Sequence, residues 1–211
     1  MNLRAVIFDL GGVVLGSPVA AIRAYESDCG LAAGSLAGLI GYGGPEGAWQ
    51  RLERGELTMT RFYEAFDAQA SRAGLRISTA GLMERMAAIA QPRAPMVTAI
   101  RKLREHGLAT AALTNNWLSD DQNGKMDLLR PEFDVFIESA RVGLRKPDKR
   151  IYEMVCEQLG VEPAQSVFLD DIGGNLKPAK EMGMLTIKVA DPIAALQELE
   201  RALGLSLVSA D

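Results

Sequence analysis

The stretch AVIFDLGGV, residues 5–13, decides the fold class of this 211-residue chain. Its residues 6–8 form a continuous apolar run, as in a strand that is buried on both faces of a parallel sheet. Asp9 ends the run, and Gly11 and Gly12 follow it, which is typical of a strand that opens into a tight turn. The sequence therefore predicts a buried parallel strand with a carboxylate at its carboxyl end.

Beyond residue 94 the chain alternates short apolar runs with stretches of helical periodicity. We expect strands at residues 108–113, 135–137, 166–169 and 184–189, and helices at residues 94–105, 119–129, 148–159, 176–182 and 192–203. Strands that alternate with helices indicate a parallel, doubly wound sheet with helices on both faces. The expected fold class is therefore α/β, with a Rossmann-like core.

Helical periodicity dominates between residues 18 and 90, without a convincing strand pattern. Pro45 is expected in the first turn of one helix, Thr58 or Thr60 at the N-cap of a second, and Ser78 at the N-cap of a third. Short helices separated by glycine-rich turns indicate a helical insertion rather than a continued sheet. We therefore divide the chain into a core of residues 1–16 and 91–211 and a small helical cap of residues 17–90.

Composition excludes several classes of protein. Hydrophobic residues make up 48% of the chain, which is enough for an ordinary globular core. The net charge of −4 argues against a nucleic-acid partner. Asp9 interrupts the N-terminal apolar stretch, so neither a signal peptide nor a membrane partner is expected. Cys29 and Cys156 are far apart in sequence and are interpreted as buried small residues of a cytoplasmic protein.

Polar residues stand at or shortly after the ends of four of the predicted strands. They are Asp9, the pair Thr114 and Asn115, Lys146, and the pair Asp170 and Asp171. Ligands of open parallel sheets bind beyond the carboxyl ends of the strands, so these side chains are expected to converge. Each alone is common as a turn or capping residue, but together they indicate an active site.

The chemistry of these side chains suits phosphoryl transfer. Asp9 and Asp171 can share a magnesium ion, which prefers oxygen ligands and neutralises charge on the transferring group. Hydrogen-bond donors from Thr114 and Asn115, with the ammonium of Lys146, can hold a phosphoryl group. Asp9 can then attack phosphorus and form an aspartyl-phosphate, which water cleaves.

The sequence resembles the haloacid dehalogenase-like superfamily in four motifs. They are residues 8–13, residues 113–115, Lys146 with Pro147, and residues 168–175, and the predicted cap lies where this family inserts its own. Within the superfamily, residues 43–47, 114–118, 137–139 and 170–178 resemble the N-terminal phosphatase domain of soluble epoxide hydrolase. Residues 187–192 and the closing helix resemble the N-terminal domain of acyl-CoA dehydrogenase family member 10.

The resemblance implies a role for each motif residue. Asp9 would be the nucleophile, and Mg²⁺ would be bound by Asp9, Asp171 and the backbone carbonyl of Gly11. Asp170 would orient Lys146, and Asn175 would close the fourth motif. The phosphoryl group or substrate would be held by Thr114, Asn115, Lys146, Gly11 and Gly12, with Thr114 and Lys146 counted among the catalytic residues. The implied activity is a phosphatase acting on a small phosphorylated metabolite.

Gly11 departs from the pattern of the family's phosphatases, which usually carry an acid/base aspartate two positions after the nucleophile. General acid catalysis contributes about 10²–10⁴-fold, so good leaving groups should suffer least from its loss. Two alternatives stay open: a dehalogenase that uses the same aspartate on carbon, and a catalytically weak domain that binds phosphorylated ligands or a partner. The paired acids at Asp170 and Asp171 favour the phosphatase. The sequence leaves the oligomeric state open.

Three further interpretations concern the surroundings of the site. Residues 42–49 either lie over the site or simply connect two helices. Trp117 either lines the pocket or packs against the core. His106 precedes Gly107 at a predicted helix end and is interpreted as a C-terminal capping residue rather than a catalytic one.

Overall fold

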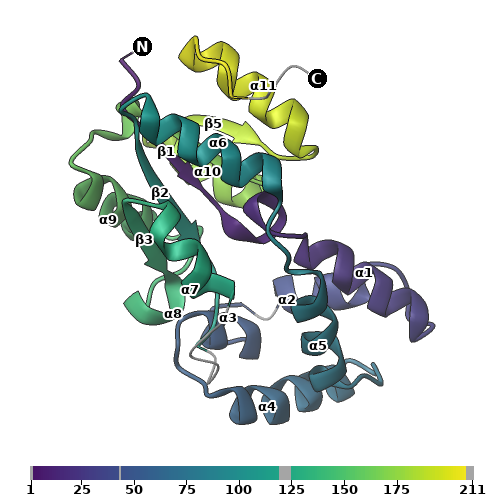
Figure 1. Ribbon diagram of the computed structural model, residues 1–211. Coiled ribbons are helices and arrows are strands. Elements are labelled where there is room, and N and C mark those ends of the chain that lie inside the picture. The colour runs from purple at the N-terminus through teal and green to yellow at the C-terminus, as the bar shows by residue number, and fades with distance from the viewer. Residues whose placement is uncertain (1, 43, 119–124, 208–211) are drawn as a thin grey trace.

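The fold is built on a five-stranded, wholly parallel sheet (Figure 1). The computed structural model describes residues 2–42, 44–118 and 125–207. The strands are β1 (Ala5–Phe8), β2 (Ala109–Thr114), β3 (Val135–Glu138), β4 (Ser166–Asp170) and β5 (Leu185–Lys188), in the order β3-β2-β1-β4-β5. β1 is the central strand, with its four residues fully buried as the apolar run predicts.

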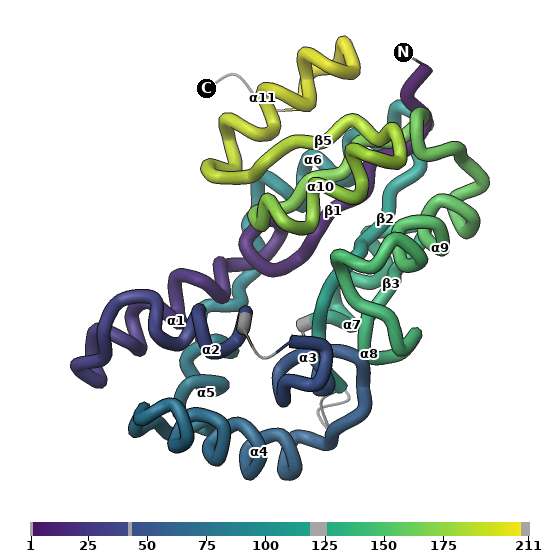
Figure 2. The backbone as a smooth tube through the Cα atoms, turned by 180° about the vertical axis from the view of Figure 1, so that it is seen from behind, coloured from purple at the N-terminus to yellow at the C-terminus, as the bar shows by residue number. Residues whose placement is uncertain are grey.

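Helices cover both faces of the sheet, which confirms the doubly wound α/β prediction (Figure 2). The helices α6 (Ala94–Glu105) and α11 (Pro192–Leu203) pack on one face, and α9 (Lys149–Leu159) and α10 (Gly173–Glu181) pack on the other. Successive side chains of a strand point to opposite faces. Accordingly Val6 and Phe8 pack with α6 and α11, whereas Ile7 packs with α9.

Local capping explains several helix boundaries. The Asp148 side chain accepts a hydrogen bond from the Arg150 amide at the start of α9, and Gly160 ends that helix in the left-handed conformation. Asp191 caps α11 in the same way, directly before Pro192. His106 is the C-cap of α6, and its ring contacts the Lys102 carbonyl at 2.7 Å, as predicted for a capping residue.

Two core helices differ from the sequence prediction. The helix predicted at 176–182 is α10 (Gly173–Glu181), which starts three residues earlier, directly after the turn that follows β4. Of the helix predicted at 119–129, the structure describes α7 (Lys125–Leu129), and residues 119–124 lie outside the described part. The other short elements of the described residues are the helical turn Leu10–Val14 after β1, α8 (Ser139–Val142) and the 3₁₀ turns Arg130–Glu132 and Pro163–Gln165.

Five helices between β1 and β2 form a helical insert, defined here as residues 18–89. They are α1 (Pro18–Asp28), α2 (Ser35–Tyr42), α3 (Ala48–Glu53), α4 (Met59–Arg72) and α5 (Thr79–Ile89). The insert has a hydrophobic cluster of its own, in which Leu36, Phe62, Phe66 and Leu82 are fully buried. It lies beyond the end of the sheet at which β1 gives way to α1 (Figure 1).

The expected caps of the insert are confirmed in two cases out of three. Thr58 caps α4 and Ser78 caps α5 through their hydroxyl oxygens. Pro45 does not begin a helix: it lies in a turn closed by the bond from the Gly47 amide to the Gly44 carbonyl, and α3 starts after it. Proline suits the second position of such a turn as well as a first helical turn, so local sequence did not separate the two.

The other sequence expectations have mixed outcomes. Cys156 is buried as predicted, but Cys29 is exposed at the end of α1, where the helix reaches solvent. Within the described residues, the helices are too short or too polar to cross a lipid bilayer.

The two chain crossings between core and insert are bound to each other. Leu15 and Pro92 form an antiparallel bridge, and the Gly16 amide donates to the Gln91 carbonyl at 3.1 Å. The Arg93 amide donates to the Val14 carbonyl at 2.8 Å. These bonds fix where the insert leaves and re-enters the core.

Gly16 is required at this crossing because a Cβ atom there would lie 2.0 Å from the Ile89 carbonyl oxygen. We expect Gly16→Ala to lower the free energy of unfolding by about 1–3 kcal/mol, since two backbone segments must separate. Urea unfolding measures this change. Gly41→Ala is the control, because a Cβ at that helical position meets no atom within 4 Å, and its stability should stay equal or rise slightly. Equal losses in both variants would contradict the explanation.

Candidate active site

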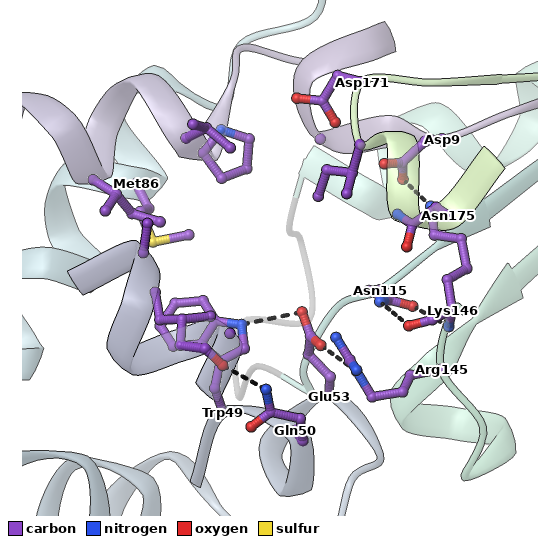
Figure 3. A pocket seen from close by; sticks show the side chains of 18 of the residues that line it. Asp9, Trp49, Gln50, Glu53, Met86, Asn115, Arg145, Lys146, Asp171 and Asn175 are labelled. Atoms are coloured by element: carbon purple, nitrogen blue, oxygen red, sulfur yellow. Dashed lines mark hydrogen bonds and ion pairs between the residues drawn. The ribbon is translucent and has the colours of Figure 1, made fainter. Parts of the chain in front are cut away.

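Carboxylates from two strand ends meet around one buried lysine, Lys146, and Figure 3 shows its ion pair with Asp9. Asp9 follows β1, and its amide donates to the Leu169 carbonyl at 2.8 Å, so it is held against β4. Lys146 Nζ lies 2.8 Å from Asp9 Oδ1 and 2.8 Å from Asp170 Oδ2. Asp9, Asp170 and Asp171 each offer a carboxylate oxygen within 4.8 Å of the other two. The structure thus brings together strand-end residues that are more than 130 positions apart in sequence.

Burial controls the electrostatics of this cluster. It raises the pKa of Asp9 to about 8, although the ammonium of Lys146 opposes the shift. Burial and then the negative charge of Asp170 raise the pKa of Asp171 to about 6. Burial also disfavours the charged Lys146, but Asp170 and Asp9 outweigh it and keep the pKa of Lys146 above its usual value. The cluster therefore favours additional positive charge next to its carboxylates.

Asp170 is a fully buried acceptor that positions its neighbours. Besides Lys146, its carboxylate accepts hydrogen bonds from the Asn175 side chain at 3.0 and 3.1 Å and from the Ile172 amide at 2.7 Å. Asn175 is anchored in turn, because its carbonyl accepts a bond from the buried Tyr152 hydroxyl at 2.7 Å. Through these bonds Asp170 and Asn175 hold Lys146 and the start of α10 in place, and their supporting roles in catalysis stay a prediction.

Gly12 permits the close approach of Asp171. A Cβ atom at this position would lie 2.1 Å from Asp171 Oδ2, which is closer than any real contact. The residue also has a φ of 83°, a conformation that favours glycine. Gly12 therefore serves the geometry of the carboxylate cluster. Gly11 lines the cavity itself, next to Asp9.

The second motif contacts the third through Asn115. Its side-chain amide donates to the Lys146 carbonyl at 3.1 Å and accepts from the Lys146 amide at 2.8 Å. These reciprocal bonds position the backbone of Lys146, a role that the sequence did not indicate. The Thr114 hydroxyl lies 3.5 Å from the Asn115 carbonyl. Among the described residues, those that line the cavity include Asn115 but not Thr114, Gly12 or Asp170.

A buried network that sequence reasoning missed supports this loop. The Asn116 amide donates to Ser139 Oγ at 2.9 Å, and its side chain donates to Glu138 Oε1 at 2.8 Å. Glu138 also binds the guanidinium groups of Arg130 and Arg141, which with Asn116 keep its pKa below the usual value although burial opposes this. The only sequence signal was the resemblance of residues 114–118 and 137–139, without a physical reason.

A cavity of about 490 Å³ opens from the cluster toward the insert. Its far wall is mainly apolar and contains Pro18, Val19, Ile22, Ala37, Ile40, Trp49, Met86 and Trp117. Trp117 lines the cavity and packs edge-on against Trp49 of the insert at 6.1 Å, so the structure agrees with the interpretation that it lines the pocket. Of residues 42–49, Trp49 lines the cavity; residue 43 and the side chain of Tyr42 lie outside the described part.

The donor set fits a hard divalent cation such as Mg²⁺. Asp170 is occupied by Lys146 and Asn175, whereas Asp9 and Asp171 face the cavity at mutual reach. Burial raises the pKa of both carboxyls, and neighbouring acids add to the shift, so a bound cation would stabilise their charged forms. Asp9 and Asp171 are therefore the residues that would hold the ion, with most remaining positions available to water.

We expect Asn116→Ala to lower the free energy of unfolding by about 2 kcal/mol, because Glu138 and Ser139 lose buried partners. Asn116→Asp should be at least as destabilising at neutral pH, since aspartate cannot donate to Glu138 and repels it. Urea unfolding checks both variants. Asn2→Ala, at an exposed position, should change stability by less than about 0.5 kcal/mol. A fully stable Asn116→Ala protein would show that the network does not hold the loop.

Comparison with known proteins connects this geometry to a family. The chain is 37% identical over 222 residues to bifunctional epoxide hydrolase 2 of Sus scrofa, covering 99% of this chain and 40% of that protein. It is 36% identical over 209 residues to acyl-CoA dehydrogenase family member 10 of Mus musculus, covering 98% of this chain and 20% of that protein. The chain thus spans a fifth to two fifths of the length of these relatives.

A relative of similar length and a solved structure extend the comparison. The chain is 29% identical over 205 residues to a sesquiterpene phosphatase of Aspergillus oryzae, covering 96% of this chain and 98% of that protein. An enzyme of Bacteroides thetaiotaomicron, solved in complex with magnesium and inorganic phosphate, shares the fold with a TM-score of 0.59 and 19% identity over 88% of this chain and 93% of that one. A family model described as haloacid dehalogenase-like hydrolase matches residues 3–183. The chain therefore belongs to the haloacid dehalogenase-like hydrolases, as its four motifs predict.

Proposed function

We propose that the protein is a magnesium-dependent phosphatase that hydrolyses a small phosphate monoester through an aspartyl-phosphate at Asp9. The observation that carries the proposal is the position of Asp9 at the cavity, 2.8 Å from Lys146 and within reach of the second carboxylate of Asp171. A lone nucleophile does not need a second acid beside it. Two acids and a lysine together suit a metal ion and a phosphoryl group.

The residues of this chain divide the work of the reaction. Bound Mg²⁺ would supply compensating charge to the phosphoryl oxygens. The Leu10 amide donates to Asp9 Oδ1 at 2.7 Å, and Lys146 Nζ lies 2.8 Å from the same oxygen. Oδ2 would attack phosphorus, while Lys146 donates to a phosphoryl oxygen and the bond from phosphorus to the leaving oxygen breaks. Water then attacks the phosphorus of the aspartyl-phosphate, which releases phosphate and restores the Asp9 carboxylate.

The leaving group would occupy the apolar part of the cavity. The walls contributed by Ile22, Ile40, Trp49 and Met86 offer contacts to a hydrocarbon or aromatic body rather than to a sugar. The relative named a sesquiterpene phosphatase, which aligns over nearly its whole length, supports an apolar substrate. The proposed substrate is therefore a phosphate monoester with an apolar body.

Gly11 determines which of these esters react well. An aspartate here would donate a proton to the leaving oxygen, and glycine has no side chain to do so. The leaving group must therefore depart as an anion or take its proton from water. Aryl and acyl phosphates are the esters for which this costs least.

The same geometry bears on the alternative of carbon–halogen cleavage. That reaction needs the nucleophile but no metal. It therefore gives no reason for the carboxylates of Asp171 and Asp9 to come within 4.8 Å of each other, or for Gly12 to leave room for Asp171. The paired acids therefore favour phosphoryl transfer.

The central test is phosphate release from acetyl phosphate and 4-nitrophenyl phosphate. We expect release with Mg²⁺, loss with EDTA, and recovery when Mg²⁺ is returned. Asp9→Asn should lose several orders of magnitude in kcat, because the amide cannot act as nucleophile. Circular dichroism confirms that the variant is folded. Release that persists in Asp9→Asn, or chloride release from 2-chloropropionate by a protein inactive on phosphates, would reject the phosphatase.

The role of Gly11 is tested by restoring an acid. A Cβ at this position would lie 3.1 Å from Pro18 Cγ, so Gly11→Asp requires a small shift of the first turn of α1. We expect Gly11→Asp to raise kcat/KM on glycerol phosphate relative to acetyl phosphate by about 10- to 100-fold, because only the poor leaving group needs a proton.

Gly11→Asn is the matched control for this experiment. Asparagine has nearly the same size and its Cβ meets Pro18 in the same way, but its amide is not acidic enough to protonate the leaving oxygen. The ratio should therefore stay at the wild-type value. An equal rise in both variants would assign the effect to the shift of α1 instead.

A further inference from the structure

An ion pair joins the insert to the core inside the cavity. Glu53, on α3, accepts a hydrogen bond from Arg145 Nε through Oε2 at 2.6 Å. Its other oxygen accepts from Trp49 Nε1, one helical turn earlier, at 3.1 Å. Figure 3 shows the Glu53 carboxylate between these two donors, on the side of the cavity that leads to Asn115 and Lys146. Both members of the pair line the cavity.

The pair is buried on the glutamate side and partly open on the arginine side. The Glu53 side chain is 9% exposed, whereas the Arg145 side chain is 25% exposed. Burial raises the pKa of Glu53, and Arg145 and Trp49 oppose that shift. The guanidinium therefore keeps some contact with the cavity, but its charge is compensated by an acceptor fixed behind it.

The position of Arg145 gives this compensation a consequence for substrates. Arg145 immediately precedes Lys146, which would hold the phosphoryl group. Both residues line the same cavity, so a free guanidinium there would bind a second anionic group of a substrate through charge-assisted, bidentate hydrogen bonds. With Glu53 in place, Arg145 is already hydrogen-bonded, and the Glu53 carboxylate repels a second anionic group of the substrate.

We propose that Glu53 is a specificity-determining residue, which neutralises Arg145. It thereby selects phosphate monoesters whose organic part carries no charge of its own over bisphosphates and phosphorylated carboxylates. This inference rests on the proposed function, because it names the class of substrate that the same site accepts. It also accounts for the charged pair that stands beside the mainly apolar far wall of the cavity.

A second cation near the cavity needs a separate test. Arg23, on α1, also lines the cavity, but it is exposed. Solvent and salt weaken the attraction of an exposed guanidinium for an anion. Arg23 should therefore contribute little to the choice between charged and uncharged substrates, and its removal serves as the matched control.

The experiment measures binding of two aryl phosphonates, which cannot be hydrolysed: 4-carboxyphenylphosphonate and its methyl ester. Trp49 and Trp117 line the cavity, so intrinsic fluorescence reports both dissociation constants. Wild-type protein should bind the ester more tightly. In Glu53→Gln the carboxylate ligand should gain affinity relative to the ester by about tenfold or more, because the ligand's carboxylate becomes the charged partner of Arg145. The double variant Glu53→Gln with Arg145→Gln should lose this shift, and Glu53→Gln with Arg23→Gln should keep it.

Each result separates a specificity role from a purely structural one. If the ion pair only held the insert against the core, its loss would weaken the binding of both ligands equally. An unchanged ratio of dissociation constants in Glu53→Gln would therefore overturn the proposal. A shift of the ratio that survives removal of Arg145 would overturn it too. If Glu53→Gln does not fold, Arg145→Gln alone decides. In that variant Glu53 has lost its arginine, so it should weaken the binding of the carboxylate ligand relative to the ester. An unchanged ratio of the two dissociation constants would again overturn the proposal. Binding needs no turnover, whereas Asp9-dependent phosphate release tests the phosphatase itself, so the two can fail separately.

Discussion

The site depends on the buried ammonium of Lys146 between Asp9 and Asp170. Three carboxylates within 4.8 Å of one another would repel strongly in a region shielded from water. Lys146 Nζ lies 2.8 Å from two of them and ties the residue after β1 to the end of β4. The same contacts leave the third, Asp171, without that compensation, and this asymmetry makes the cluster suitable for a metal ion.

The backbone brings these groups together before any side chain acts. β1 lies between β2 and β4, so the residues that follow the three strands meet at one edge of the sheet. The fine adjustment comes from close backbone approaches: Gly12 admits Asp171, and Asn115 clamps the backbone of Lys146 through two hydrogen bonds. Catalytic geometry here is a property of loops that are fixed at both ends by a rigid sheet.

The sequence predicts the sheet and the charged cluster because both follow from local rules. Apolar runs give the strands, and strand ends give Asp9, Lys146 and the acids of β4. The role of Asn115 was not predictable, since its partner depends on how the segment before α9 folds back. Glu53 carried no signal at all, because its meaning comes from an arginine 92 positions away in sequence. Local patterns thus identify reactive groups, whereas the residues that position them and select the substrate appear only in the tertiary structure.

The helical insert supplies most of the apolar wall that faces the carboxylate cluster of the core. The two segments that join it to the core are bound to each other at the Leu15–Pro92 bridge. The insert also contacts the core where Gly55 meets α8, at which a Cβ would lie 2.2 Å from the Ala140 carbonyl oxygen. Between these contacts it covers the carboxylate cluster with apolar side chains and with one compensated charge pair. In the proposed function, the core would bind the phosphoryl group at Asp9, and the insert would select what is attached to that group. Changes confined to the insert can alter the substrate without disturbing Lys146 and its two carboxylates.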